Sequence, residues 1–178
     1  MKTEKIIELS AKFLNIEKYV SGEDKDQKIL SLLMTALNNV ISEIAEEYVP
    51  FKKRERIEVQ DGQVKYSDLS ETVKEILNVK SGKEKLNFRL FENGIEVDFC
   101  GEVEITYAYI PKAVEYGDEI ELPVGITERT VACGVAGEYA LMSERYEECV
   151  NYDNRFLSGI KAVKRNKKER KLPYWRWI

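Results

Sequence analysis

Apolar residues recur at every third or fourth position near the start of the chain, and this spacing predicts two helices. The apolar positions fall on one helical face over residues 3–19 and again over residues 25–48. Pro50 is expected to end the second helix, and Ser21 or Asp24 is expected to cap its start. Because only a short loop separates the two helices, we expect them to pack as an antiparallel pair.

From residue 55 onward apolar and polar residues alternate, which predicts strands. The dipeptides Asp61-Gly62 and Asn93-Gly94 each separate two alternating runs, and both supply the positive φ angles that tight hairpin turns need. The expected registers place these residues opposite each other: Val59 and Val64, Ile57 and Tyr66, Leu90 and Val97, and Phe88 and Phe99. A last strand over residues 102–109 ends before Pro111, so we expect an antiparallel sheet with one packed face and one face in contact with water.

A helical pattern begins at Thr127, the expected N-cap, and runs without interruption to about residue 165. The positions that form its apolar seam are Ala132, Val135, Tyr139, Met142, Tyr146, Cys149, Asp153, Phe156, Ile160 and Val163, with Asp153 the one polar member. Small residues cluster early in this segment, at Gly134, Ala136, Gly137 and Ala140. They would allow another backbone to approach closely.

These elements predict an α+β fold built on an antiparallel helical bundle, with two N-terminal helices and one long C-terminal helix. An antiparallel β-hairpin lobe is inserted at about residues 55–111. Since the helices on either side of the insertion need one another for burial, we expect residues 1–165 to form one domain. Residues 166–178 follow as an extended C-terminal arm.

Charge is distributed unevenly along the chain. The whole sequence of 178 residues has a net charge of −4, with 43% hydrophobic and 34% charged residues, as expected of a folded protein with a charged exterior. Residues 161–178 contain eight basic residues and one acid, which gives them +7 and leaves −11 for residues 1–160. Such asymmetry between a body and a terminus is typical of an interaction arm.

The arm also holds both tryptophans, which are the residues that a folded domain most readily buries. A basic stretch does not enter a core, so we interpret the arm as a docking element that contacts a surface of another protein. The candidate partner-binding residues are Lys168, Arg170, Lys171, Leu172, Pro173, Tyr174, Trp175, Arg176, Trp177 and Ile178. The alternative interpretation is a solvated, frayed helix end.

The residues offer little catalytic chemistry. The chain has no histidine, which excludes most zinc sites and the Ser-His and Cys-His nucleophile pairs. The cysteines, Cys100, Cys133 and Cys149, are widely spaced and are expected to be reduced and mostly buried. We therefore predict no catalytic residue, no metal and no cofactor; an enzyme with an acid or cysteine centre is the least favoured alternative.

The order of elements, together with four short motifs, resembles a known family. The motifs are Glu102-Val103-Glu104-Ile105-Thr106-Tyr107-Ala108-Tyr109-Ile110-Pro111, Leu122-Pro123, Gly137-Glu138-Tyr139-Ala140-Leu141 and Arg145-Tyr146-Glu147-Glu148. Over residues 1–165 the chain looks like the head-to-tail connector or tail adaptor proteins of tailed bacteriophages.

The resemblance implies a structural virion protein and not an enzyme. Such proteins assemble as rings, commonly of twelve copies, between the portal and the tail. The implied partners are further copies of the chain, the portal protein and tail or nozzle proteins, with possible contact with packaged DNA. The implied location is the neck of the virion, after assembly in the host cytoplasm.

Two further expectations concern partners. No apolar run approaches the roughly 20 residues that span a bilayer, and acids interrupt the apolar N-terminal stretch, so we expect no membrane partner and no secretory signal. A nucleic-acid-binding module is the alternative function, with Lys161–Lys171 and the cluster Lys52–Arg56 meeting phosphates and Trp175 and Trp177 stacking on bases. The acidic body counts against this alternative, because nucleic-acid binders usually have a basic body.

Overall fold

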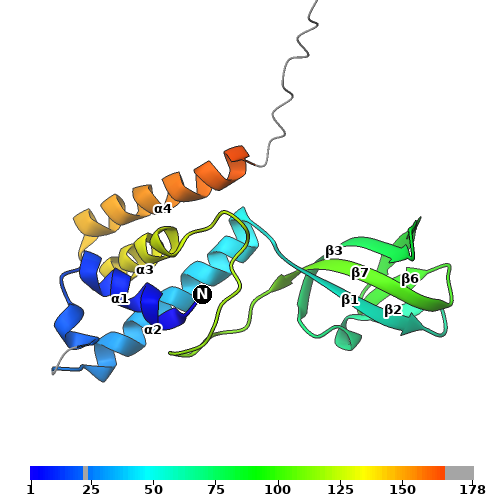
Figure 1. The fold of residues 1–178 in the computed structure, drawn as a ribbon, viewed down its shortest axis with the longest axis horizontal. Coiled ribbons are helices and arrows are strands. Elements are labelled where there is room, and N and C mark those ends of the chain that lie inside the picture. The colour runs from blue at the N-terminus through cyan, green and yellow to red at the C-terminus, as the bar shows by residue number, and fades with distance from the viewer. Residues whose placement is uncertain (22–23, 167–178) are drawn as a thin grey trace, which may run out of the picture. The chain divides into compact units, whose positions relative to one another are not determined.

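The computed structural model describes residues 1–21 and 24–166, and within those ranges it contains four α-helices and seven strands in two antiparallel sheets (Figure 1). The structure is α+β, 45% helical and 28% strand. The chain divides into two compact units. The helical unit comprises Met1–Leu37, Tyr116–Ile120 and the described residues from Val124 onward, and the sheet unit comprises Asn38–Glu115 and Glu121–Pro123. That residues 1–165 form one domain stays a prediction.

The predicted fold class, a helical bundle with one long C-terminal helix and a hairpin lobe, is wrong. Residues expected to form the long helix form two, α3 (Glu128–Met142) and α4 (Tyr146–Asn166). The inserted strands form two separate sheets rather than a lobe of two hairpins.

Helix α3 ends at a turn that contains no glycine or proline. The amide of Ser143 bonds to the carbonyl of Tyr139 at 3.0 Å, and the amide of Arg145 reaches back to the carbonyl of Ala140 at 2.8 Å. Glu144 has a φ of 59°, a left-handed conformation that non-glycine residues rarely adopt. Two antiparallel helices that face each other both place apolar residues on the shared seam, so their three-and-four spacing continues in phase through this turn.

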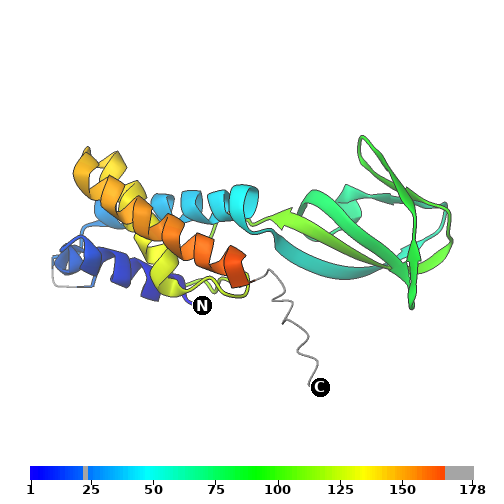
Figure 2. The same cartoon turned by 90° about the horizontal axis from the view of Figure 1, so that it is seen from above.

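The remaining helices are α1 (Thr3–Phe13) and α2 (Gln27–Glu43), with a short 3₁₀ turn at Glu17–Tyr19 and a π-helical turn at Ile44–Tyr48 that continues α2. Asp26 rather than Ser21 or Asp24 caps α2, since its Oδ1 accepts from the amide of Lys28 at 2.8 Å. Within the helical unit, α1 packs against α3 and α3 packs against α4 (Figures 1 and 2).

Two predictions about α3 are confirmed. Thr127 is the N-cap, and its Oγ1 accepts from the amide of Thr130 at 3.2 Å. The small residues let α4 approach closely, because a Cβ at Gly137 would lie 3.4 Å from the backbone nitrogen of Asp153.

Helix α2 and its π-helical turn, Gln27–Tyr48, form a segment long and apolar enough to cross a membrane by length and composition. A core helix meets the same criterion. Leu33, Leu37 and Ile44 of this segment are completely buried in the described structure.

The sheet unit contains a four-stranded and a three-stranded sheet. The first has the order β1 (Phe51–Val59), β7 (Gly101–Ile110), β3 (Thr72–Ser81) and β4 (Glu84–Leu86). The second has the order β2 (Gln63–Lys65), β6 (Gly94–Val97) and β5 (Phe88–Phe91). Both sheets contribute to one buried core: Val59, Val64, Leu69, Ile76, Val79, Ile95, Val97, Val103, Ile105 and Tyr107.

The strand over residues 102–109 is confirmed as β7, but both hairpin registers are wrong. Asp61-Gly62 does form a turn, with φ +70° at Gly62, yet β1 pairs with β7 and β2 with β6. The turn therefore passes the chain from one sheet to the other. The hairpin β5–β6 exists, but Phe88 is opposite Val97 and Leu90 opposite Ile95, two residues away from the expected register.

Candidate interaction surfaces

The C-terminal arm, the principal candidate from the sequence, lies outside the described residues. All ten predicted partner-binding residues, Lys168 and Arg170–Ile178, fall beyond Asn166, where α4 ends. Their role stays a prediction. The described residues offer other candidates, in the helical unit and in the sheet unit.

A dense cluster of titratable side chains lies on β1 and its neighbours in the sheet unit. The hydroxyl of Tyr107 donates to Oε1 of Glu55 at 2.7 Å, and the amide of Ser70 donates to Oε2 at 3.1 Å. Lys53 Nζ lies 3.5 Å from Oε1 of Glu55 and 3.2 Å from Oε1 of Glu71.

Two cations offset the two carboxylates of this cluster, because Lys112 Nζ also lies 3.5 Å from Oε2 of Glu71. Burial alone would raise the pKa of Glu55, but the hydrogen bonds from Ser70 and Tyr107 outweigh it and hold that pKa below its usual value. Burial, followed by the bond to Glu55, raises the pKa of Tyr107. A carboxylate stabilised as an anion and a phenol stabilised as a neutral donor form a structural pair, which joins β1 to β7.

Replacing Tyr107 with phenylalanine should lower the free energy of unfolding of the sheet unit by about 1–3 kcal/mol at pH 7, because Glu55 loses a donor in a largely buried position. Urea denaturation measures the loss. Tyr66→Phe is the matched control, since the Tyr66 hydroxyl makes no hydrogen bond within the described residues.

The same variant has a defined pH dependence. The folded pKa of Glu55 lies below 4.5, so its stabilisation is complete above that pH and is lost as the pH falls through the folded pKa. The variant should therefore be less stable than the wild type above pH 4.5, and the gap should close in more acidic solution. A gap that stays constant down to pH 2 would contradict this assignment.

The basic cluster Lys52–Arg56 does not form one positive surface. Lys53 points into the network just described, while Arg54 and Arg56 lie 3.5 and 4.0 Å from the carboxylate of Glu104 on β7. The carboxylate of Glu104 offsets part of the charge of Arg54 and Arg56.

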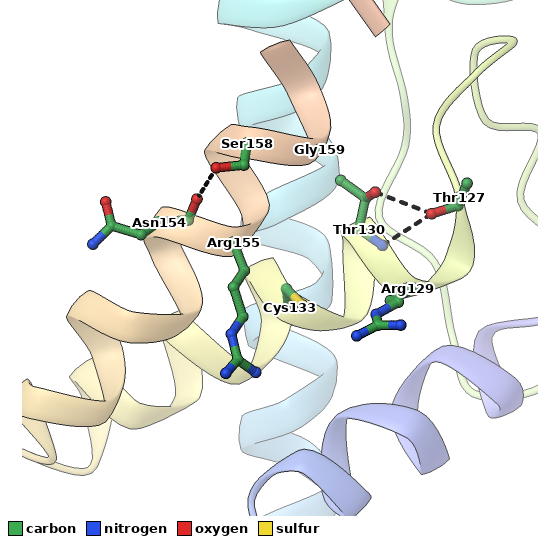
Figure 3. A pocket seen from close by; sticks show the side chains of 8 residues that line it. All are labelled: Thr127, Arg129, Thr130, Cys133, Asn154, Arg155, Ser158 and Gly159. Atoms are coloured by element: carbon green, nitrogen blue, oxygen red, sulfur yellow. Dashed lines mark hydrogen bonds between the residues drawn. The ribbon is translucent and has the colours of Figure 1, made fainter. Parts of the chain in front are cut away.

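A surface groove of about 630 Å³ lies between the first turns of α3 and the middle of α4 in the helical unit (Figure 3). It is lined by Thr127, Arg129, Thr130, Cys133, Asn154, Arg155, Ser158 and Gly159. We call it the arginine groove. Gly159 permits the close approach of the two helices, because a Cβ there would lie 2.7 Å from the side chain of Thr130.

The arginine groove carries positive charge that no ion pair within the described residues offsets, although the Arg155 guanidinium lies 5.7 Å from the centroid of the Tyr152 ring. Figure 3 shows Arg129 and Arg155 extending to the same side, with Cys133 between them. Burial raises the pKa of the Cys133 thiol, and Arg155 and Arg129 both oppose that rise, so both guanidinium groups act on this one place. Neither arginine forms an ion pair within the described residues, and no carboxylate lines the groove.

The sequence did not indicate this groove. Arg129 and Arg155 are 26 residues apart, and on one continuous helix they would lie about 40 Å apart. The turn between α3 and α4 brings them together. The cysteines also differ from expectation: all three are free, but Cys100 is exposed, while Cys149 is half-buried and Cys133 is buried.

Large apolar side chains are exposed on both sides of the turn between α3 and α4. We call them the turn patch; they are Leu141, Met142, Tyr146 and Val150, which are 48%, 37%, 62% and 60% exposed. Tyr146 and Val150 are one helical turn apart, so they lie on one face of α4. Met142 and Tyr146 were expected in the buried seam; they are exposed because the chain turns between them.

A loop with Tyr116, Asp118 and Glu119 lies against the start of α1, which carries Glu4 and Glu8, and Lys2 pairs directly opposite Glu119. The amide of Thr3 donates to the carbonyl of Asp118 at 3.0 Å, which fixes this loop against the start of α1. Burial raises the pKa of Tyr116, and the carboxylates of Glu4 and Glu8 raise it further. Glu4, Glu8 and Glu119 form no ion pair within the described residues.

Neither a scan against protein-family models nor a search of curated proteins finds a match for this chain. In the part of the chain that the structure describes, no group of three or more acidic or cysteine side chains is placed to hold a metal ion.

Proposed function

We propose that this protein is a structural component of a tailed-phage virion, a head-to-tail connector that forms a ring between the portal and the tail. The observation that carries the proposal is the turn patch. Four large apolar side chains beside the turn between α3 and α4 are exposed, and exposed apolar side chains that are neighbours in the structure are typical of a protein–protein contact. The motif resemblance over residues 1–165 supports the same function.

In this proposal the mechanism is geometric. Copies of the chain pack side by side through their helical units, and the resemblance suggests twelve of them. The arm follows α4 in the chain. Trp175, Arg176 and Trp177 then contact the portal, since tryptophan and arginine dominate the binding energy of most interfaces.

The partners follow from the same proposal. They are the portal, tail or nozzle proteins and, inside the ring, packaged DNA. The site of action is the virion neck after assembly in the host cytoplasm. The role is structural and not enzymatic.

The mass of the full chain in solution, alone and mixed with its candidate portal, tests this function. We expect a ring to form on the portal, measured by native mass spectrometry or light scattering. A chain that lacks residues 172–178 should keep its circular dichroism spectrum and thermal transition but lose portal binding.

Two results would contradict the proposal. Absence of any assembly by the full chain, with or without the portal, would exclude the ring. Equal portal binding by the truncated chain would exclude docking through the arm. A DNA-binding measurement at low salt separates the nucleic-acid alternative, which requires an affinity that falls steeply as salt rises.

A further inference from the structure

We propose that α4 of one copy of this chain packs antiparallel against α4 of a second copy, so that the free protein forms a two-fold dimer. The inference does not depend on the proposed ring, because it rests on one exposed side of a single helix. It names the residues that meet across the two-fold axis and the direction in which the two helices run.

One exposed side of α4 carries an apolar stripe with charged residues among its members. Tyr146, Val150 and Leu157 fall within roughly 40° of one another around the helix, at about 100° per residue. Tyr146 and Val150 are more than half exposed, and Leu157 is half-buried. Asp153 and Lys161 lie on the same side and are exposed. We call these five residues the α4 stripe.

The opposite requirement, a buried side, is met by a different part of α4. Phe156, Ile160 and Val163 are almost completely buried in the helical unit. The α4 stripe is turned roughly 90° away from them around the helix. Asp153 and Lys161 form no ion pair and no side-chain hydrogen bond within the described residues. The α4 stripe can therefore accept a partner while α4 stays packed on its own unit.

The α4 stripe is complementary to itself in the antiparallel direction. Asp153 and Lys161 lie four residues before and after Leu157, which is about 6 Å along the helix on either side. A two-fold axis at Leu157 therefore places Asp153 of each copy opposite Lys161 of the other, with the two Leu157 side chains between the ion pairs. A parallel arrangement would instead place each charge opposite the same charge.

The distribution of charge along α4 favours the same direction. Residues 146–156 carry three acids and one base, and residues 157–166 carry three bases and no acid; they are Glu147, Glu148, Asp153 and Arg155, and then Lys161, Lys164 and Arg165. In an antiparallel pair the acidic half of each helix meets the basic half of the other. Because residues 1–160 carry −11, identical copies repel each other unless opposite charges meet locally. Charge complementarity therefore identifies a second copy as the occupant.

The dimer has a consequence for the proposed ring, and this consequence alone rests on the proposed function. Val150 belongs both to the α4 stripe and to the turn patch. A copy that is paired through α4 therefore does not present a complete turn patch to a neighbour in the ring.

A charge-swap experiment tests the pairing in the full chain. Asp153→Lys and Lys161→Glu should each dimerise about tenfold more weakly than the wild type, because two ion pairs become two like-charge pairs. An equal mixture of the two variants should form mixed dimers, since both pairs of opposite charge return in them. The double variant Asp153→Lys/Lys161→Glu should dimerise as the wild type does, because each ion pair returns with its charges exchanged.

Sedimentation velocity over a concentration series measures dimerisation, and native mass spectrometry identifies the mixed dimers. Glu17→Lys and Lys12→Glu are the matched controls, since they make the same changes in net charge at exposed positions outside α4. Circular dichroism should show that every variant folds.

A short bis-maleimide cross-linker tests the position of the two-fold axis. Leu157→Cys/Cys100→Ser should give a cross-linked dimer, because the two copies of residue 157 face each other; Cys100 is removed because it is exposed. Asn151→Cys/Cys100→Ser is the control, since Asn151 is exposed on a different side of α4. It should remain uncross-linked.

Several results would overturn this contact and leave the proposed ring untouched. A full chain that stays monomeric over the concentration series is one of them. Dimerisation that is unchanged in both single variants is another, and so is a loss in both without recovery in their mixture. Equal cross-linking of the two cysteine variants would overturn the antiparallel contact at Leu157.

Discussion

Gly94→Ala should destabilise the sheet unit by about 3 kcal/mol or more, the largest effect we expect from any single methyl group in this chain. A Cβ at residue 94 would lie 2.1 Å from the carbonyl oxygen of Val64 and 3.0 Å from the Cα of Lys65. Both atoms belong to the backbone of β2, so no side-chain rotation relieves the contact. Strand β2 must then move away from β6 and lose its place in the core.

Hydrogen exchange followed by mass spectrometry should locate this loss. We expect faster exchange in β2, β5 and β6, with protection in α3 and α4 unchanged. Gly82→Ala is the matched control, because nothing lies within 4 Å of a Cβ there and only its φ of +56° opposes the substitution. It should cost about 1–2 kcal/mol. If Gly94→Ala and Gly82→Ala lower the free energy of unfolding equally, β2 can move away from residue 94 at little cost, and the prediction is wrong.

Tyr146→Asp/Val150→Asp should abolish ring assembly and leave the monomer folded. Both side chains are more than half exposed in the single chain, so their replacement should change the free energy of unfolding by no more than about 0.5 kcal/mol. At a subunit boundary the same positions would bury two unpaired carboxylates in an apolar contact. A loss of about 100-fold or more in association follows, because buried aromatic anchors carry much of the energy of an interface.

Light scattering over a range of protein concentrations measures this association. Asn151→Asp/Ala162→Asp adds the same two charges at exposed positions of α4 outside the turn patch and should assemble as the wild type does. Normal assembly of the Tyr146→Asp/Val150→Asp variant would exclude the turn patch as a ring contact. Loss of assembly in the control as well would point to net charge as the cause.

The alternating pattern was sufficient to locate strands but not to pair them. Residues 102–109 were correctly predicted as a strand, because the alternation and the proline that follows are local signals. That β1 pairs with β7 depends on a contact between residues about 50 positions apart, for which the local alternation carries no information. The Asp61-Gly62 turn was therefore taken as a hairpin, although it joins two sheets.

The sequence pointed to Gly94 as a structurally required glycine, but for the wrong reason. It was read as a turn glycine with positive φ, yet residues Glu92 and Asn93 form the turn and Gly94 already pairs with Phe91. Its lack of a side chain is needed because the neighbouring strand β2, whose Lys65 pairs with Gly94, leaves no space for a Cβ. A strand that needs a close neighbour and a turn that needs a positive φ both favour glycine. A single sequence therefore does not show which of these two reasons applies.

The candidate surfaces were missed for a related reason. The spacing that predicts one helix over residues 127–165 also fits two helices folded against each other, and Glu144 gives no glycine signal at the turn. With one helix, Arg129 and Arg155 are remote, and Met142 and Tyr146 are buried. With two helices, Arg129 and Arg155 line one groove, and Met142 and Tyr146 are exposed.

Asn38 joins the two ends of the segment that contains all seven strands. Its side-chain amide donates to the carbonyl of Val114 at 3.2 Å, and its amide oxygen accepts from the Val114 backbone nitrogen at 2.8 Å. All seven strands lie between these two residues, so one side chain holds together the two ends of the segment that contains both sheets. Segments whose ends lie close together are the ones that tolerate insertion and exchange. Strands in this segment could therefore be lengthened, shortened or replaced without separating its two ends.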